Sequence, residues 1–562
     1  MANLALCLLW HQHQPLYRDL GVEAKGAYRL PWVRLHALRD YYSMAALATE
    51  LETVRVTINL TPVLAWQLND YAEGGGTDRA LELTLKRAES LTTDERQEVL
   101  ASFFGAEPRT QIARWPRYAE LSKLRNEHHA FGVDDLRDLQ AWFSLCWFGQ
   151  EFQTSDVRLV TGETVSVRRF IEQGEHFAHS DLEAIVAEQY KVLRAVLPFH
   201  RSLQDAGKIE VSTTPFYHPI LPLLLDSGPA GPVPHLSRPD DAEAQIRLAV
   251  TYYEQVFGQR PRGMWPAEGA VNPAALAVLA AHNLQWIATD QSVLGRSGRW
   301  GYRDDDPNTL CRPYRGEGTA GELALFFRER ELSNSIGFRY HAYADADQAA
   351  RDFVNQIHAR ISSRLDRRQD HVLTVALDGE NPWGGYADGG REFLRALYRR
   401  LAADAEVATS TFSGYLNGDG SSGQRAHPTT EQERVYELHA GSWVDDPAAP
   451  RDAAFATWIG DPDENHAWEI LGRAREALDR TGHTPASLPL AFEALYAAEG
   501  SDWFWWFGED QGSTWDAELD ELFRSHVRRA YLAADLEPPA ELDWPIAARL
   551  RPASRKVCSA GT

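Results

Sequence analysis

An uninterrupted apolar run near the start of the chain, LALCLLW at residues 4–10, most constrains how this chain can fold. The run has the length of one β-strand and lacks a polar face, which is typical of a parallel strand buried on both sides. Parallel neighbours in a sheet are joined by crossover connections, which are usually helices. The run therefore predicts a chain in which strands alternate with helices.

That alternation recurs over much of the sequence. Further segments of strand length, rich in apolar and β-branched residues, lie at 54–60, 208–214, 284–290 and 371–377. Apolar residues with helical spacing lie between and after them, at 242–258, 273–283 and 391–405. Strands that alternate with helices predict an α/β sheet or barrel.

Two segments interrupt the alternation. Residues 76–206 have the charge and hydrophobic spacing of helices, which indicates a long helical insertion. The Gly- and Ser-rich segment Asn417–Gln424 is the best candidate for a linker, and helical patterns follow it. A chain of 562 residues is too long for one compact domain. We therefore expect a first domain at residues 1–415, which contains the insertion, and a mainly helical domain at 416–562.

The charge balance disfavours several classes of partner. The chain has 57 basic and 80 acidic residues, a formal net charge of −23. Such a surface repels phosphate backbones and anionic lipids, so we expect neither nucleic acid nor membrane as a partner. A neutral ligand such as a sugar fits better. The 18 Trp residues either fill a large core or offer flat surfaces on which sugar rings stack.

The cysteines and the N-terminus bear on the compartment. Cys7, Cys146, Cys311 and Cys558 form no C-x-x-C pair, so neither a zinc ribbon nor a redox pair is indicated. The first residues lack a basic region and a cleavage site, and their apolar run is too short to span a membrane. These features predict a cytoplasmic protein. The sequence indicates no oligomeric state.

Two carboxylates stand where predicted strands end. Glu268 lies in PRGMWPAEGAV, and Asp378 lies in HVLTVALDGENPW. Catalytic groups of α/β folds collect at the C-terminal ends of strands, and two carboxylates there are the minimal equipment for cleaving a glycosidic bond. The alternatives are a salt-bridged surface residue for Glu268 and an Asn-Pro turn in a polar loop for Asp378.

The segment His11-Gln12-His13, directly after the first strand, is open to three interpretations. Alternate residues of a strand share a face, so both imidazoles could bind one metal ion together with a carboxylate such as Asp290 or Asp378. They could equally bind a sugar by hydrogen bonds, or be structural. The aromatic segment 500–508 is similarly open, because its rings could form core or contact a ligand.

Five segments together resemble motifs of glycoside hydrolase family 57. They are H-x-H-Q-P at 11–15, T-T-P-F-Y-H-P-I at 213–220, G-M-W-x-x-E at 263–268, L-D-G-E-N-P-W at 377–383 and S-D-W-F-W-W at 501–506. The second carries one extra residue between Pro and His relative to the family pattern. Because the five occur in order from residue 11 to residue 506, the resemblance covers nearly the whole chain.

The resemblance implies a fold and roles for the motif residues. The fold is an incomplete (β/α)7 barrel of the TIM type, followed by a helical region that helps close the active site. Glu268 is similar to the family's nucleophile and Asp378 to its general acid/base. No metal and no cofactor are implied. The implied substrate-binding residues are His11, His13, His218, Trp265, Glu380, Trp383, Asp502, Trp503 and Trp505.

The resemblance also implies a reaction, which is hydrolysis of α-glucans with retention of configuration. Double displacement places the two carboxyl groups about 5–5.5 Å apart. The third and fourth motifs look most like the amylopullulanase and α-amylase branch, although W-P-A-E-G replaces the W-A-A-E-S associated with amylopullulanases. The substrates would be α-1,4 linkages, with α-1,6 linkages as a further option. The alternatives are a 4-α-glucanotransferase, a branching-type transglycosylase, or a metal-dependent glycosidase that uses His11 and His13.

Overall fold

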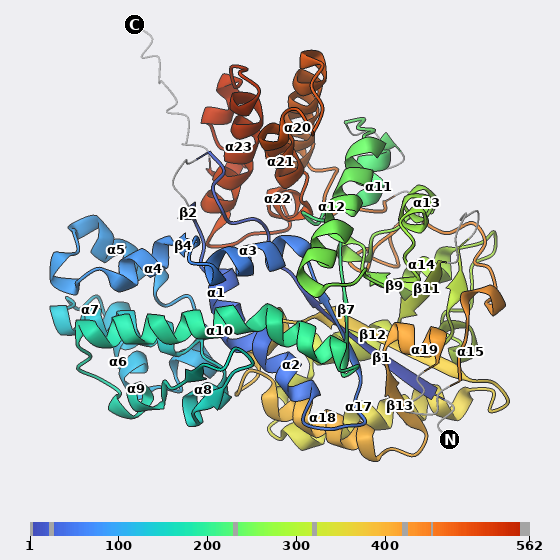
Figure 1. Cartoon of the computed structure of the whole chain (residues 1–562), viewed down its shortest axis with the longest axis horizontal. Coiled ribbons are helices and arrows are strands. Elements are labelled where there is room, and N and C mark those ends of the chain that lie inside the picture. The colour runs from blue at the N-terminus through green and yellow to red at the C-terminus, as the bar shows by residue number, and fades with distance from the viewer. Residues whose placement is uncertain are drawn as a thin grey trace, which may run out of the picture.

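The computed structural model describes residues 4–21, 27–228, 234–316, 323–418, 425–450 and 453–550. Most of the predicted linker, residues 419–424, and Cys558 lie outside these ranges. Figure 1 shows a barrel in the middle of the molecule, a helical lobe on one side of it, and a group of C-terminal helices above it.

Seven parallel strands form the barrel, so the predicted (β/α)7 fold is confirmed. Their order is β7 (Ile209–Ser212), β3 (Val56–Leu60), β1 (Leu4–Gln12), β12 (His371–Asp378), β11 (Ala324–Arg328), β9 (Trp286–Asp290) and β8 (Gly263–Met264). A parallel bridge between Thr213 and Met264 joins the two ends of this order and nearly closes the ring. Outside the ring, β13 (Val407–Ser410) pairs with β1, and β10 (Tyr314–Arg315) pairs antiparallel with β11.

The period of two along each strand divides the core into an inner and an outer part. On β1, Ala5, Cys7 and Leu9 belong to a small cluster inside the barrel, with Trp286, Ala288, Ala324, Phe326, Val372 and Ala376 of other strands. The intervening Leu4, Leu6, Leu8 and Trp10 belong to the large outer cluster that the helices cover. A strand buried on both faces in this way explains why its sequence is apolar throughout.

The inward-facing series ends in polar residues at the C-terminal end of four strands. Counting in steps of two, it leads to His11 on β1, Asp378 on β12, Asp290 on β9 and Arg328 on β11. The strand register places His11 directly opposite Asp378, and Arg328 opposite Asp290. The hydrophobic pattern that fills the barrel therefore also gathers these four side chains at one end of it.

Helices surround the barrel and form the predicted insertion. The barrel helices are α1 (Trp32–His36), α2 (Tyr42–Ala48), α3 (Pro62–Ala72), α11 (Leu221–Leu225), α12 (Pro239–Phe257), α13 (Pro273–Ala281), α14 (Gln291–Arg296), α15 (Pro307–Leu310), α16 (Arg330–Phe338), α17 (Ala346–Gln356), α18 (Arg391–Ala403) and α19 (Phe412–Asn417).

The insertion comprises α4 (Arg79–Leu85), α5 (Thr93–Ser102), α6 (Pro116–Asn126), α7 (Val133–Leu145), α8 (Gln150–Thr154), α9 (Arg168–Gln173) and α10 (His179–Asp205). It also contains one short hairpin that the sequence did not predict, β5 (Val157–Arg158) with β6 (Thr164–Val165). The two-residue strands β2 (Ala27–Tyr28) and β4 (Thr77–Asp78) pair with each other.

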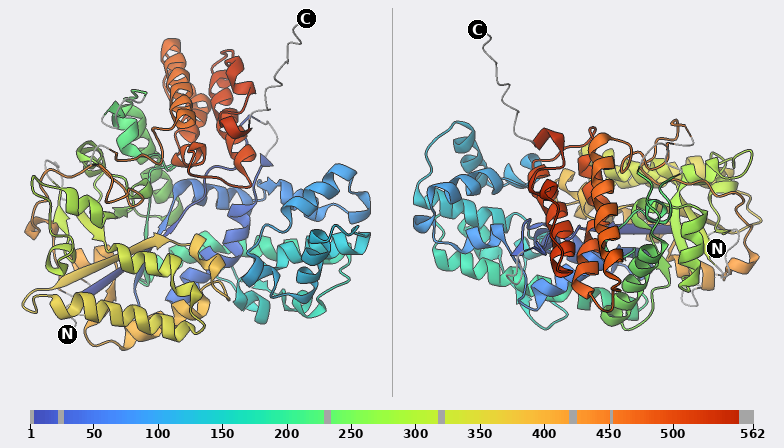
Figure 2. Two further views of the ribbon diagram at one scale, coloured as in Figure 1. Left: turned by 180° about the vertical axis from the view of Figure 1, so that it is seen from behind. Right: turned by 90° about the horizontal axis from the view of Figure 1, so that it is seen from above.

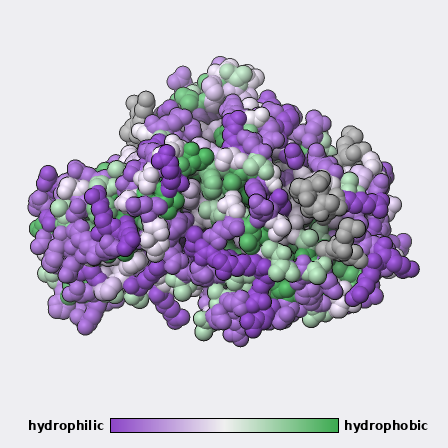
Figure 3. Space-filling view, turned by 60° about the horizontal axis from the view of Figure 1, so that its bottom comes forward, coloured by the Kyte–Doolittle hydropathy of each residue, from purple (hydrophilic) through white to green (hydrophobic). Residues whose placement is uncertain are grey.

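The C-terminal part is helical, as the sequence predicts. It consists of α20 (Pro462–Thr481), α21 (Pro489–Ala498), α22 (Ser501–Phe507) and α23 (Asp516–Ala533), which both views of Figure 2 show grouped together. Among the described residues, none of the helices has both the length and the apolar character needed to cross a bilayer. Figure 3 shows a mainly hydrophilic surface on which hydrophobic side chains gather near the middle of one face.

Candidate active site

The polar ends of the barrel strands open into a cavity of about 920 Å³. Seven of the residues that the sequence proposes for the site line this cavity: His11, His13, Glu268, Asp378, Glu380, Asp502 and Trp505. They come from the ends of β1 and β12, from the segments that follow β1, β8 and β12, and from α22, so the barrel and the C-terminal helices build the wall together.

Glu268 lies in a sharp turn after β8. Its φ is +56° and that of Gly269 is +61°, so two successive residues adopt the left-handed conformation. Any residue other than glycine would be strained at 269, because φ is positive there and a Cβ would lie only 3.0 Å from the ring of Trp265. The turn directs the carboxylate of Glu268 towards the indole of Trp443, whose Nε1 donates a hydrogen bond of 2.6 Å to Oε2.

Burial raises the pKa of the Glu268 carboxyl to about 8, and the negative charge of Asp378 contributes to the same shift. The hydrogen bond from Trp443 acts in the opposite direction, because it stabilises the ionised form. A carboxyl group in this environment takes up a proton more readily than one in water.

Asp378 is the last residue of β12. Asn381 Nδ2 donates a hydrogen bond of 3.0 Å to its Oδ2. Burial raises the pKa of Asp378, and the Asn381 bond and the positive charge of Arg328 partly oppose this rise. Since Asp378 raises the pKa of Glu268, the two groups do not readily ionise together. One protonated and one ionised carboxyl group is the combination that an acid and a nucleophile acting in one site require.

Glu380 organises the loop after β1 and lies at the wall of the cavity. Its Oε1 accepts a hydrogen bond of 3.0 Å from the backbone N–H of His13 and one of 3.4 Å from Gln14 Nε2. Burial, with the charge of Asp378 next in size, raises its pKa well above the usual value. These contacts tie the fourth motif to the first.

The tautomer of His11 follows from its neighbour Asn59. Asn59 Nδ2 donates to the carbonyl oxygen of Thr213 at 2.7 Å, which fixes the orientation of the amide. The Oδ1 of Asn59 is therefore the acceptor for His11 Nδ1 at 2.6 Å. Burial lowers the pKa of His11 to about 3, so the ring is neutral, with its proton on Nδ1. Its Nε2 is left as an acceptor for a hydroxyl group.

His13 and His218 connect the barrel to α22. His13 Nε2 lies 3.0 Å from both carboxylate oxygens of Asp502, and His218 Nδ1 lies 2.9 Å from Ser501 Oγ. The two rings are stacked, with centroids 3.8 Å apart. Burial lowers the pKa of His218 well below its usual value. His218 is not among the described residues that line the cavity, but it stacks against His13, which does, and its Nδ1 lies 4.0 Å from Glu268 Oε1.

A metal site would require ring nitrogens and a carboxylate oxygen that converge on one point. Among the described residues, one nitrogen each of His13 and His218 and an oxygen of Asp502 lie within 4.8 Å of one another. A histidine binds metal through a lone pair in its ring plane, about 2.0–2.1 Å from the ion. The two rings are stacked with 17° between their planes, so their lone pairs do not converge on one point. The rings of His11 and His13, the pair that the sequence proposes for a metal, are likewise stacked with 17° between their planes, so neither pair fits a metal ion. Asp290 does not supply a ligand either, because Arg328 and Arg330 pair with its carboxylate.

Three tryptophans that the sequence proposes as substrate-binding residues are core residues instead. Trp265, Trp383 and Trp503 are at most 1% exposed and are not among the described residues that line the cavity. The indole N–H groups of Trp383 and Trp503 donate to the carbonyl oxygens of Gly379 and Ala497. With both faces packed against protein, these rings have no surface to offer a sugar.

Aromatic and charged residues outside the proposed set of site residues also line the cavity. Among them are Trp32, Arg328, Phe338, Trp443, Trp506 and Trp515. The buried Arg328 ends β11 and donates to Asp290 Oδ2 at 2.8 Å and to the carbonyl oxygen of Ala376 at 2.9 Å. The inward series on β11 would have indicated Arg328, if this strand had been recognised in the sequence.

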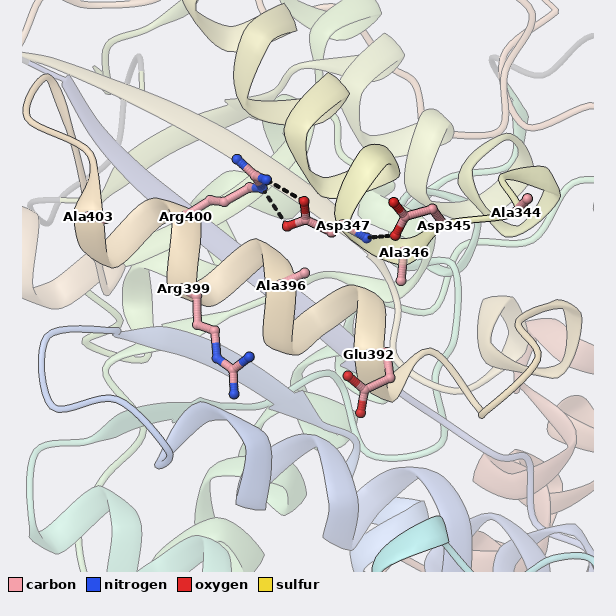
Figure 4. Close-up of a pocket in the computed structure, with 9 residues that line it drawn as sticks. All are labelled: Ala344, Asp345, Ala346, Asp347, Glu392, Ala396, Arg399, Arg400 and Ala403. Carbon is pink, nitrogen blue, oxygen red and sulfur yellow. Dashed lines mark hydrogen bonds and ion pairs between the residues drawn. The ribbon is translucent and has the colours of Figure 1, made fainter.

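A second hollow, of about 740 Å³, lies on the outer layer between α17 and α18 (Figure 4). Its Arg400 points towards Asp347 and bonds to both carboxylate oxygens of that residue, whereas Arg399 points away from them. None of the residues of the five motifs lines this hollow, and its Asp347 is paired with Arg400, so the strand-end cavity is the better candidate for an active site.

The chain is similar to known proteins in sequence and in fold. A profile of Glycosyl hydrolase family 57 matches residues 7–431, which is most of the chain. A 1,4-alpha-glucan branching enzyme of Thermococcus kodakarensis is 28% identical over 163 residues, 25% of this chain and 22% of that protein. Alpha-amylase 1 of Dictyoglomus thermophilum is 29% identical over 90 residues, 16% of this chain and 11% of that protein. The matched segments thus span less than a quarter of either relative.

Solved structures show the same fold over almost the whole chain. The branching enzyme of Thermococcus kodakaraensis superposes with a TM-score of 0.56 at 17% identity, covering 94% of this chain and 88% of its own. The alpha-amylase AmyC of Thermotoga maritima gives a TM-score of 0.55 at 15% identity, covering 94% and 93%. The 4-alpha-glucanotransferase of Thermococcus litoralis gives 0.51 at 14% identity, covering 94% and 60%.

A barrel whose aromatic-lined cavity holds two carboxylates beside its strand ends has the equipment that cleavage of a glycosidic bond requires. The chain belongs to glycosyl hydrolase family 57.

Proposed function

We propose that this protein cleaves α-glucans with retention of configuration, using Glu268 as the nucleophile and Asp378 as the general acid/base. The observation that carries the proposal is the pair itself. Asp378 ends β12 and Glu268 lies in the turn after β8, both line one cavity, and burial together with the charge of Asp378 raises the pKa of Glu268.

In the first step, an oxygen of ionised Glu268 attacks the anomeric carbon while protonated Asp378 gives its proton to the departing oxygen. The glycosidic bond breaks and a glycosyl ester of Glu268 forms. In the second step, ionised Asp378 takes a proton from the acceptor, whose oxygen attacks the anomeric carbon. The ester bond breaks, its electron pair returns to the Glu268 carboxylate, and Asp378 is again protonated.

The remaining residues of the wall suit a neutral, hydroxyl-rich ligand. Neutral His11 offers Nε2 as an acceptor, and Asp502 and His13 offer further polar groups. Trp505 and Trp506 supply partly exposed aromatic rings in the same wall. We assign His11, His13, Asp502 and Trp505 to substrate binding, with His218 and Glu380 holding them in place.

The acceptor in the second step decides between hydrolysis and glucan transfer. We propose hydrolysis of α-1,4 linkages as the main reaction, in line with the α-amylase and amylopullulanase character of the motifs. Transfer is the second candidate, since the aromatic wall extends beyond the carboxylates to Trp32, Phe338 and Trp515, where a sugar acceptor could stack. The similar structures carry names of both kinds, an alpha-amylase and a 4-alpha-glucanotransferase.

Product analysis tests this proposal. The enzyme is incubated with maltoheptaose, amylose and pullulan, and the products are separated by chain length and linkage. Hydrolysis releases reducing ends in proportion to bonds cleaved, whereas transfer yields longer or branched chains without a net gain of reducing ends. Glu268→Gln is the matched control and should be inactive. Activity equal to the wild type in that variant would refute the assignment of the nucleophile.

We also propose a cytoplasmic location. The cysteines Cys7, Cys146 and Cys311 are buried and free, as suits a reducing compartment.

A further inference from the structure

We propose that Trp443 is a positioning residue of the reaction, which holds one oxygen of Glu268 and so selects the other as the attacking atom. The inference rests on the proposed role of Glu268. Trp443 lies beyond residues 7–431, where the family profile matches, and the sequence motifs do not include it.

The side chain of Trp443 is held on several sides at the cavity wall. Its Nε1 donates to Glu268 Oε2 at 2.6 Å. Its ring meets that of Trp265 edge-on with centroids 4.9 Å apart, and the guanidinium of Arg328 lies 5.0 Å from its centroid. The ring of His11 meets it edge-on at 6.2 Å. Because these contacts leave the indole little freedom, the N–H direction is set before a substrate binds.

The backbone around Trp443 is joined to the turn that carries Glu268. Gly441 and Val271 exchange two hydrogen bonds of 2.9 and 3.0 Å in an antiparallel bridge. The N–H of Trp443 donates to the carbonyl oxygen of Glu268 at 3.1 Å. Glu268 thus receives a backbone and a side-chain hydrogen bond from the same residue. This double contact holds Glu268 in its left-handed conformation, which is unfavourable for a residue with a side chain.

The hydrogen bond from Trp443 distinguishes the two carboxylate oxygens of Glu268. With Oε2 committed to Trp443, Oε1 is the oxygen left to form the bond to the anomeric carbon. A hydrogen bond to an ionised acceptor is stronger than one to a neutral ester carbonyl. Trp443 therefore stabilises the carboxylate as it departs in the second step, and in the free enzyme it opposes the rise that burial causes in the pKa of Glu268. Both effects require the indole N–H and not only the bulk of the ring.

The test compares Trp443→Phe, which keeps an aromatic ring but loses the N–H, with the wild type. We expect kcat to fall by about 10- to 100-fold, as for loss of a hydrogen bond to a charged group. The acidic limb of the kcat/KM profile should move to higher pH, because Glu268 loses a bond that favours its ionised form. With an α-glycosyl fluoride as substrate, a burst of fluoride should precede a slow steady state, because release of the ester becomes limiting.

Two further variants separate this role from a structural one. Trp443→His restores a ring N–H and should recover part of the shift in the acidic limb. Trp544→Phe makes the same type of change at a residue that is 62% exposed and outside the cavity lining, and should leave the profile unchanged. Melting temperatures identify any variant that fails to fold. If Trp443→Phe does not fold, Trp443→His is compared with the wild type in its place.

The outcomes distinguish this inference from the proposed function. An acidic limb and fluoride kinetics in Trp443→Phe that match the wild type, in a folded protein, would overturn the role of Trp443 alone. A fully active Glu268→Gln would overturn the proposed function, and this inference with it.

Discussion

The buried carboxyl of Glu268 leads to a prediction about stability that does not depend on the identity of the substrate. Its pKa of about 8 lies above the usual value of 4.5, so the folded protein binds this proton more tightly than the unfolded chain does. At pH values below 4.5 both states are protonated and the group contributes nothing. As the pH rises towards 8, only the unfolded state gains an ionised carboxylate, so the free energy of unfolding falls.

Glu268→Gln removes this dependence. At about 1.36 kcal/mol per pH unit, the full shift corresponds to at most about 5 kcal/mol. The side chain is 18% exposed and the shift is shared with Asp378, so we expect the variant to gain roughly 2–3 kcal/mol above pH 8. The amide keeps the volume of the side chain and an acceptor for Trp443, so little else changes.

The assay is thermal unfolding of wild type and Glu268→Gln from pH 4 to pH 9. The melting temperatures should coincide near pH 4 and diverge as the pH rises, with the variant higher. Glu175→Gln is the matched control, because Glu175 is exposed and should change stability by less than about 0.5 kcal/mol. A constant difference across the pH range, or a variant that melts lower at pH 8.5, would refute the reasoning.

Other parts of the site give predictions of their own. Asp378→Asn should lose activity on maltooligosaccharides by a factor of about 10³ or more. It should retain cleavage of an α-glycosyl fluoride, because the fluoride leaving group needs little protonation, and an equal loss on both substrates would contradict the role of Asp378 as the acid. Asp502→Asn should raise KM about 10-fold through loss of the contact with His13, and an unchanged KM would remove Asp502 from the binding wall. Dialysis against EDTA should leave activity unchanged, since the stacked rings of His13 and His218 do not fit a metal ion, and loss of activity restored by Zn²⁺ would contradict this.

Much of the barrel could be predicted because its strands carry their pattern locally. The run at 4–10 extends to β1 (Leu4–Gln12), and the segments at 54–60 and 371–377 contain or nearly match β3 and β12. The sequence did not reveal β11, because its five residues stand between charged segments without a clear alternation. Its end residue Arg328 was missed for the same reason.

The motifs predicted which residue types carry the chemistry of the site. They predicted less well which side chains point into the cavity. Glu268, Asp378 and Asp502 line the cavity as expected. Proximity to a motif says nothing about which way a ring faces, so Trp383 and Trp503 proved to be core residues. Trp443 was missed because a β-bridge between distant segments brings it to Glu268, and such long-range pairing leaves no local pattern.

The domain boundary near residue 415 remains a prediction. A chain that ended at this boundary would lose part of the candidate site, because segments beyond it contribute residues to the site. The C-terminal α22 supplies Asp502 and Ser501, and Trp443 also follows this point. We therefore expect the barrel alone to lack a complete active site.

The central claim is that Glu268 forms a covalent glycosyl intermediate, and trapping it is the most direct test. A 5-fluoro-α-glycosyl fluoride is added to the enzyme, which is then digested and analysed by mass spectrometry. Our account predicts one added sugar on the peptide that contains Glu268, and none in Glu268→Gln. A sugar attached to another residue, or a product of inverted configuration with no labelled peptide, would contradict it.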